Sequence, residues 1–359
     1  MKIGTVDVAP SFALAPMAGM TDTAFRRLVK RRGGCGLVVT EMVSSEGLVR
    51  GIDRTLEYAE YTEEERPVSI QIFGGDPEKM AAAAQIVEGM GADIVDVNMG
   101  CPVPKIAKHN AGCSLMREPE HAASVIRAMT KAIKIPVTVK MRAGWDATEI
   151  NAPDLARRIE DAGAAAVAVH GRTAAQSYSG SSDWDLIARV ASGLSIPVFG
   201  SGDCIEPGQM VERMQSGVSG VLVGRGALRN PFIFEQAAAL AAGRPVRPVT
   251  HEERGRFLLE YIELLQNERL GESAGFRHIA PGVSAALAPG ELTVASEARG
   301  PARGHDKWVI NKLRALNSWY TKGIDNGSHL RVRINAAESI PHLRDIIEDF
   351  FLAPVAPSL

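Results

Sequence analysis

Short apolar stretches alternate with longer amphipathic stretches from residue 11 to about residue 240. Most of the short stretches are rich in Val and Ile and are apolar throughout, which is typical of strands buried on both faces of a parallel sheet. The stretches between them, such as Glu78–Gly89 and Glu120–Lys131, have helical spacing. We predict strands at Phe12–Pro16, Leu37–Glu41, Val68–Phe73, Asp93–Asn98, Val137–Arg142, Ala166–His170, Pro197–Gly200 and Gly220–Gly224.

The repeated strand–helix unit predicts an α/β fold of the (β/α)8 TIM-barrel type. A doubly wound open sheet is the alternative that this pattern allows. The positions of the polar residues favour the barrel, because barrel enzymes build their active sites at the carboxyl ends of the strands. At or just beyond these predicted ends lie Gln71, Asn98, Lys140, Arg142, His170, Asp203 and Arg225.

The pattern changes after the predicted barrel. Residues 251–270 form one amphipathic helix by their spacing, and residues 307–352 again show helical periodicity. Between them, residues 271–306 are rich in Gly, Ala and Pro, which indicates a flexible linker or a long surface loop. We therefore predict a TIM-barrel catalytic domain at 1–245 and an all-α helical domain at 246–359 with an insertion at about 271–306.

Charge is balanced over the whole chain but uneven within the helical domain. With 40 Lys+Arg against 42 Asp+Glu, the chain is not a generally basic nucleic-acid binder. Residues 307–333, however, hold several cations against Asp325 alone. A polyanion contact is the prediction for this stretch, and a solvated helix face is the alternative. The cations are Lys307, Lys312, Arg314, Lys322, Arg331 and Arg333.

Neither a membrane nor a metal is expected. No stretch approaches the roughly 18 apolar residues of a membrane span, and the start MKIGTVDVAP lacks a signal-peptide pattern, so we expect a cytoplasmic protein. Cys35, Cys101, Cys113 and Cys204 form no CxxC pair and no zinc-finger spacing, so neither disulfides nor a metal site is predicted.

Glycine-rich segments follow the seventh and eighth predicted strands. They are Gly200-Ser201-Gly202-Asp203 and Gly224-Arg225-Gly226. Loops at these two places bind phosphate in TIM barrels, because glycine lets backbone N–H groups approach the anion closely. Arg225 adds a charge-assisted contact. The two segments together predict a phosphate site.

Candidate chemistry lies at three further strand ends. Lys140 and Arg142 are two residues apart and face the same side of their strand, where two cations need an anionic partner. His170 closes the sixth strand beside the same mouth, and a Lys and a His there could stabilise the negative charge of a reduced flavin. Cys101 follows the fourth strand in a Gly/Pro-shaped loop, and a thiol is mostly protonated at neutral pH, so Cys101 is a candidate general acid. The other three cysteines are expected to pack.

Taken in order, these motifs closely resemble the bacterial tRNA-dihydrouridine synthase family, with most likeness to its B-type members. The resemblance covers essentially all of 1–240 and resumes at 317–323 and 330–350. It rests on APMAGMTD (15–22), TEMV (40–43), QIFG (71–74), DVNMGCP (96–102), KMRAGW (140–145), HGRT (170–173), GRG (224–226) and NSWYTKG (317–323).

This resemblance implies an FMN-dependent enzyme that consumes NADPH and reduces the C5=C6 bond of particular uridines in tRNA. Reduced FMN would deliver hydride from N5 to C6, and Cys101 would protonate C5. The target base would be flipped into the barrel mouth. Asn98 and Arg142 would orient the uracil. The flavin would be lined or contacted by Pro16, Met17, Ala18, Gln71, Lys140 and His170, and its phosphate held by Ser201, Gly202, Asp203, Gly224 and Arg225.

The helical domain would bind tRNA, with contacts from Lys312, Arg314, Lys322, Arg331 and Arg333. The chain departs from the family pattern in three places: Ser201 replaces an Asn, Arg314-Ala315-Leu316 replaces a basic run, and the insertion has no counterpart. Two other functions stay open, namely an FMN barrel that acts on a free pyrimidine and a tRNA-binding protein without catalysis. No obligate protein partner is expected.

Overall fold

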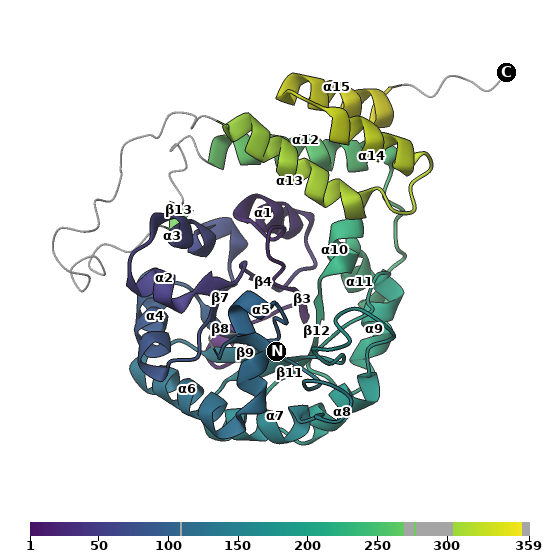
Figure 1. Cartoon of the computed structure of the whole chain (residues 1–359). Coiled ribbons are helices and arrows are strands. Elements are labelled where there is room, and N and C mark those ends of the chain that lie inside the picture. The colour runs from purple at the N-terminus through teal and green to yellow at the C-terminus, as the bar shows by residue number, and fades with distance from the viewer. Residues whose placement is uncertain (108–109, 269–275, 278–303, 354–359) are drawn as a thin grey trace.

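The computed structural model describes residues 1–107, 110–268, 276–277 and 304–353. Its centre is a closed barrel of parallel strands, each hydrogen-bonded to its neighbours, with the ring closed by the pairing of β4 with β7 (Figure 1). This closure confirms the predicted (β/α)8 barrel and excludes the open sheet. The strands are β3 Phe12–Leu14, β4 Leu37–Val39, β7 Val68–Phe73, β8 Ile94–Met99, β9 Val137–Arg142, β10 Ala166–His170, β11 Val198–Ser201 and β12 Gly220–Val223.

Two strands end two residues earlier than the sequence predicts. β3 stops at Leu14 and β4 at Val39, so Pro16 and Glu41 lie in the loops beyond them. Proline has no N–H to donate to the ladder, which fits its place outside the strand. The two-residue β5 Val43–Ser44 continues the line of β4 along β7.

Helices surround the barrel (Figure 1), and several of them begin at capping residues. Asp22, Asp76 and Asp183 accept backbone N–H bonds at the starts of α1, α4 and α8, as N-cap residues do. The helices are α1 Thr23–Arg32, α2 Ser45–Val49, α3 Asp53–Ala59, α4 Pro77–Gly89, α5 Pro104–Ala107, α6 Pro119–Ala132, α7 Ala152–Asp161, α8 Trp184–Ser192, α9 Pro207–Met214, α10 Arg225–Arg229 and α11 Ile233–Ala241.

A small hairpin at the N-terminus closes the base of the barrel. Its strands are β1 Lys2–Ile3 and β2 Val6–Asp7, which pair antiparallel. Ile3 is buried in an apolar cluster with residues at the starts of several barrel strands, including Leu37, Ile94 and Phe199. The sequence pattern did not predict this element, because two-residue strands carry no readable periodicity.

The C-terminal helices pack together beside α1 and α10 (Figure 1). They are α12 His251–Glu268, α13 His305–Tyr320, α14 Gly327–Ala336 and α15 Ile340–Phe351. An aromatic contact joins them to the barrel, since the Phe257 ring meets Phe25 of α1 edge-on at 6.1 Å; within the C-terminal helices Phe257 also stacks on Tyr320 of α13 at 5.7 Å. The helical character of the C-terminal region is thus confirmed, while the division into domains at residue 245 stays a prediction.

Most of the predicted insertion at 271–306 lies outside the described residues. Within it, the backbone of β13 Phe276–Arg277 pairs antiparallel with β6 Tyr61–Thr62. The two remaining short elements are 3-10 turns at Glu63–Glu65 and Gly112–Arg117.

Candidate active site

Register places the predicted site residues in layers at the carboxyl ends of the strands. In the deepest layer, Gln71 is opposite Asp96 and Asp96 is opposite Thr138. One layer higher, Asn98 is opposite Lys140. The top layer aligns Arg142, His170 and Ser201 on β9, β10 and β11. The fold thus brings together polar residues that are far apart in the sequence.

A chain of hydrogen bonds leads from a buried carboxylate to the loop that carries Cys101. Asp96 accepts bonds from the Thr138 hydroxyl and from the Gln71 amide, both at 2.6 Å. The other end of the Gln71 amide accepts from Asn98 at 2.7 Å. The Asn98 oxygen then accepts from the backbone N–H of Cys101 at 2.9 Å. Because Asp96 takes the Gln71 N–H, it fixes the orientation of both amides.

Sequence reasoning expected Gln71 to touch a flavin and Asn98 to touch a uracil. In the structure both amides are engaged in this chain, and Gln71 is fully buried. Asp96 was not predicted to have a role. The only sequence signal for it is an acidic residue inside an apolar strand, which needs partners to be tolerated. Burial raises the pKa of Asp96, against the hydrogen bonds from Gln71 and Thr138 and the charge of Lys140.

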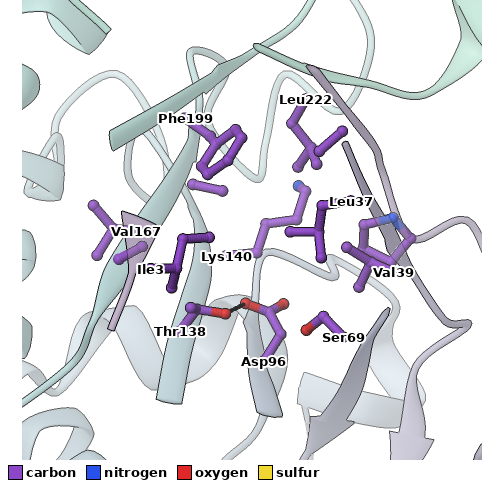
Figure 2. A pocket seen from close by; sticks show the side chains of 14 residues that line it. Ile3, Leu37, Val39, Ser69, Asp96, Thr138, Lys140, Val167, Phe199 and Leu222 are labelled. Atoms are coloured by element: carbon purple, nitrogen blue, oxygen red, sulfur yellow. Dashed lines mark hydrogen bonds between the residues drawn. The ribbon is translucent and has the colours of Figure 1, made fainter. Parts of the chain in front are cut away.

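Lys140 of β9 points into the barrel interior, one layer above Asp96 (Figure 2). It borders a small cavity whose walls are mainly apolar, among them Leu37, Phe199 and Leu222 (Figure 2). The pKa of Lys140 is lowered from 10.5 to about 8, first by burial and then by nearby Arg142, while Asp96, Cys113 and Cys101 oppose the shift. Among the described residues, no carboxylate forms an ion pair with Lys140. The ammonium group is therefore held at the mouth at an energetic cost.

Cys101 differs from the other cysteines in its surroundings. It is half-buried in the loop after β8, whereas Cys35, Cys113 and Cys204 are buried. Burial raises the pKa of the Cys113 thiol to about 11 and that of Cys204 to about 12, so these thiols are inert. The prediction that three cysteines pack is confirmed. Cys101 is the thiol that stands at the mouth.

Arg142 ties the Cys101 loop to the loop after β10. Its Nε donates to the Gly100 carbonyl at 2.8 Å, and its Nη1 donates to the carbonyls of Thr173 and Ser177, both at 3.0 Å. The guanidinium also lies 5.9 Å from the ring of Tyr178, which is 59% exposed. Sequence reasoning missed Tyr178, whose exposed ring offers a face to a planar group at the mouth.

The glycine-rich loops after β11 and β12 meet around Asp203. Its carboxylate binds Arg172 at 2.8 Å, accepts from the Ser182 N–H at 2.7 Å, and lies 3.6 Å from Arg225. Burial alone would raise the pKa of Asp203, but the Ser182 bond and Arg172 hold it below its ordinary value. Asp203 thus orients two arginines. Arg172, which the sequence analysis left without a role, is a buried cation at this site.

Gly202 lies where the loop after β11 packs closely against Ser182. Its φ is +124°, and a Cβ there would come within 2.6 Å of the Ser182 side chain. Only glycine fits this backbone. Ser201 is buried, and its carbonyl accepts from the Ser182 hydroxyl at 3.1 Å. Gly224, the last residue before α10, is close to Met17: a Cβ on it would be 3.3 Å from the Met17 sulfur.

His170 is neutral in this environment. Its pKa is lowered to about 2, first by burial and then by the charges of Lys140, Arg142, Arg172 and Arg225. Its Nδ1 accepts from the Arg172 N–H at 3.1 Å, which leaves the proton on Nε2. His170 can therefore donate one hydrogen bond but carries no charge of its own.

The mouth as a whole carries an excess of positive charge. Lys140, Arg142, Arg172 and Arg225 face Asp203 and the buried Asp96. An ammonium group that pairs with no carboxylate of the described residues, and an arginine beside two glycine-rich loops, suit an anionic cofactor with a phosphate. Pro16, Met17 and Ala18 are half-buried to exposed beside them, where a ring could pack. The residues present therefore fit FMN. In the described part of the chain, no cluster of His, Cys, Asp or Glu could hold a metal ion.

The cations predicted to bind tRNA do not all lie on the surface. Lys312 of α13 binds Asp22, in the loop after β3, at 2.9 Å, so its ammonium group is engaged within the chain. Arg314 is engaged by Asn311 and the Ala337 carbonyl, and Arg333 pairs with Asp349 at 2.7 Å. Lys322 is exposed and lies 4.0 Å from the Trp319 ring, and Arg331 is half-buried. Lys322 and Arg331 remain the candidates for phosphate contacts.

Fold and site together define a TIM-barrel enzyme with a cationic mouth, two glycine-rich loops beside it and one thiol that is not buried. The chain matches the family described as Dihydrouridine synthase (Dus) over residues 13–299. It therefore belongs to the dihydrouridine synthase family, which confirms the family and the oxidoreductase class predicted from the sequence.

Named relatives agree with this assignment, and a solved structure shares the fold. The chain is 40% identical to "tRNA-dihydrouridine synthase B" of Xanthomonas axonopodis over 267 residues, covering 74% of this chain and 80% of that protein. It is 34% identical to the "Probable tRNA-dihydrouridine synthase" of Rickettsia conorii over 98% of this chain and 96% of that protein. A 2-naphthoyl-CoA reductase structure aligns with TM-score 0.50 and 13% identity over 68% of this chain and 52% of its own, which reflects the shared fold. In the described helices, none is long and apolar enough to cross a membrane.

Proposed function

We propose that this protein is a tRNA-dihydrouridine synthase that uses FMN and NADPH to reduce the C5=C6 bond of uridines in tRNA. The observation that carries the proposal is the Cys101 thiol, held at a cationic barrel mouth by Asn98. Family membership supports the reaction, and the relatives' names support tRNA as the substrate. A tRNA substrate also favours a cytoplasmic place of action.

Each group at the mouth has a task in this proposal. FMN, when bound and reduced by NADPH, supplies the hydride for C6 of the uracil. Arg225 and the N–H groups of the glycine-rich loops would hold its phosphate, and Lys140 would face the anionic edge of its ring. Cys101 donates its proton to C5 on the opposite side of the base. Arg142 keeps the Cys101 loop in place through Gly100.

The target uracil must leave the folded tRNA to reach Cys101 at the barrel mouth. Flipping it costs a few kcal/mol, which contacts to the tRNA backbone must offset. The C-terminal helices, with Lys322 and Arg331, are the proposed surface for these contacts. The exposed ring of Tyr178 beside Arg142 provides a place where the flipped base can stack.

The test is dihydrouridine formation on unmodified tRNA with FMN and NADPH, with free uracil and dihydroorotate as parallel substrates. Cys101→Ala should lose most of the product while it keeps FMN and tRNA binding. Cys113→Ala is the matched control, because it removes a buried thiol whose backbone N–H donates to the Cys101 carbonyl at 3.1 Å. Turnover of the free pyrimidines alone would refute tRNA as the substrate, and full activity of Cys101→Ala would refute the proton donor.

A further inference from the structure

Lys312 reaches from the C-terminal helices into the loop that follows β3. Its ammonium group binds Asp22 Oδ2 at 2.9 Å, the Gly19 carbonyl at 3.1 Å and Glu41 Oε1 at 3.5 Å. The Lys312 side chain is only 14% exposed, and those of Asp22 and Glu41 are 10% and 7% exposed. This ion cluster is therefore shielded from the solvent that weakens surface ion pairs.

The partners of Lys312 are themselves fixed from both sides. Asp22 caps α1 through the Phe25 N–H at 2.9 Å and accepts a bond from the Tyr261 hydroxyl of α12 at 2.8 Å. Glu41 accepts from the Gly19 N–H at 2.5 Å. Gly19 thus offers its carbonyl to Lys312 and its N–H to Glu41, which holds the peptide groups on both sides of it.

The segment held in this way is the one expected to line the cofactor. Gly19 follows Met17 and Ala18, and Met17 closes a turn by accepting from the Thr21 N–H at 3.1 Å. On its other side, Met17 is in reach of Gly224 in the loop after β12. One short segment therefore connects the phosphate-accepting loop to a lysine that comes from the C-terminal helices.

We propose that Lys312 is a positioning residue that sets the 17–22 segment for FMN and joins the C-terminal helices to the cofactor site. The proposal rests on the function proposed above. It also replaces a tRNA contact by Lys312, since an ammonium group shared by two buried carboxylates and a carbonyl is not presented to a phosphate.

Removing the ammonium group has a direct physical consequence. Burial already raises the pKa of Glu41, while Lys312, the Gly19 N–H and Arg26 oppose the rise and Asp22 adds to it. Without Lys312, two carboxylates are left in a shielded place and the Gly19 carbonyl loses its donor. The segment then relaxes away from this arrangement, because an uncompensated buried charge is costly.

The experiment measures FMN binding by the apoprotein through quenching of flavin fluorescence, together with tRNA binding. Lys312→Met should raise the FMN Kd roughly tenfold, in keeping with the loss of hydrogen bonds to charged groups. Lys312→Arg should restore most of the affinity. Lys307→Met is the matched control: it removes an exposed cation from the same helix and should leave the FMN Kd unchanged. Glu41→Gln, which keeps an acceptor for Gly19, should give a smaller increase.

The outcomes separate this proposal from the proposed function. Failure of the wild-type protein to bind FMN refutes the cofactor and with it the proposed function. Wild-type FMN binding with an unchanged Kd in Lys312→Met overturns the positioning role alone. A raised tRNA Kd with an unchanged FMN Kd would also overturn it, by returning Lys312 to the phosphate contacts. Thermal unfolding of each apoprotein identifies any variant that has lost its fold, in which case Glu41→Gln decides.

Discussion

Lys140 should make the protein less stable at neutral pH than a variant without it. The pKa of Lys140 falls from 10.5 in the unfolded chain to about 8 in the folded protein, mainly through burial. A shift of this size corresponds to a cost of about 3 kcal/mol for keeping the ammonium group charged in the fold. Lys140→Met removes the charge and keeps most of the apolar stem, so it should raise the free energy of unfolding at pH 7 by up to this amount.

The sign of the pH dependence follows from the same shift. Below pH 8 the lysine is charged in both states, and the full cost is present. Between pH 8 and pH 10.5 the unfolded chain binds the proton and the folded protein does not, so the stability of the wild type rises with pH across this window. Above the window the amine is neutral in both states, and the cost disappears.

Urea unfolding of the two apoproteins at pH 7, 9 and 10.5 measures the effect. The difference between wild type and Lys140→Met is the quantity to follow, because tyrosines, thiols and other lysines titrate in both proteins and cancel. Expected is a gap of about 3 kcal/mol at pH 7 that closes as the pH rises. If the difference in unfolding free energy is absent or does not change with pH, the idea that the fold is destabilised by the charge of Lys140 is refuted.

Two further predictions concern the chain from Asp96 and the C-terminal cations. Asp96→Asn lets the Gln71 amide turn over, so the loop that carries Cys101 is no longer fixed. Product formation should fall roughly fivefold at unchanged tRNA affinity, which matches the loss of about one hydrogen bond. An unchanged rate would show that the hydrogen-bond chain does not position the thiol. Neutralising Lys322 and Arg331 together should lower the magnitude of the slope of log K against log salt for tRNA binding by roughly 1 per charge. Lys312→Met should leave that slope unchanged, and equal slopes in all proteins would show that the C-terminal helices do not contact phosphates.

The barrel was predictable from the sequence because its strands are short, apolar throughout and regularly spaced. A strand such as Val137–Arg142 has the same bounds in the prediction and in the structure. The ends were harder: the loops at Pro16 and Glu41 begin where neighbouring strands stop pairing, which is not a local property of the chain. The N-terminal hairpin has too few residues for any periodicity.

The sequence predicted which residues belong to the candidate site better than it predicted the contacts that they make. Lys140, Arg142 and His170 were selected because cations and a histidine at strand ends are unusual, and the fold does bring them together. Asp96 and Arg172 were not selected, since their roles depend on partners from other strands. Lys312 was predicted to contact tRNA because it belongs to a run of cations. The helical turn can direct one member of such a run towards the protein interior. Only the fold shows that Lys312 meets a carboxylate there.

The closed base of the barrel has a consequence for the order of events. Ile3 and its apolar neighbours fill the base of the barrel, and Ile3 borders the same cavity as Lys140, so we expect ligands to approach Lys140 from the carboxyl ends of the strands. A nicotinamide donor and a folded nucleic acid would then compete for the same entrance. On the function proposed above, the catalytic cycle would then divide into two half-reactions, with the donor leaving before the nucleic acid docks.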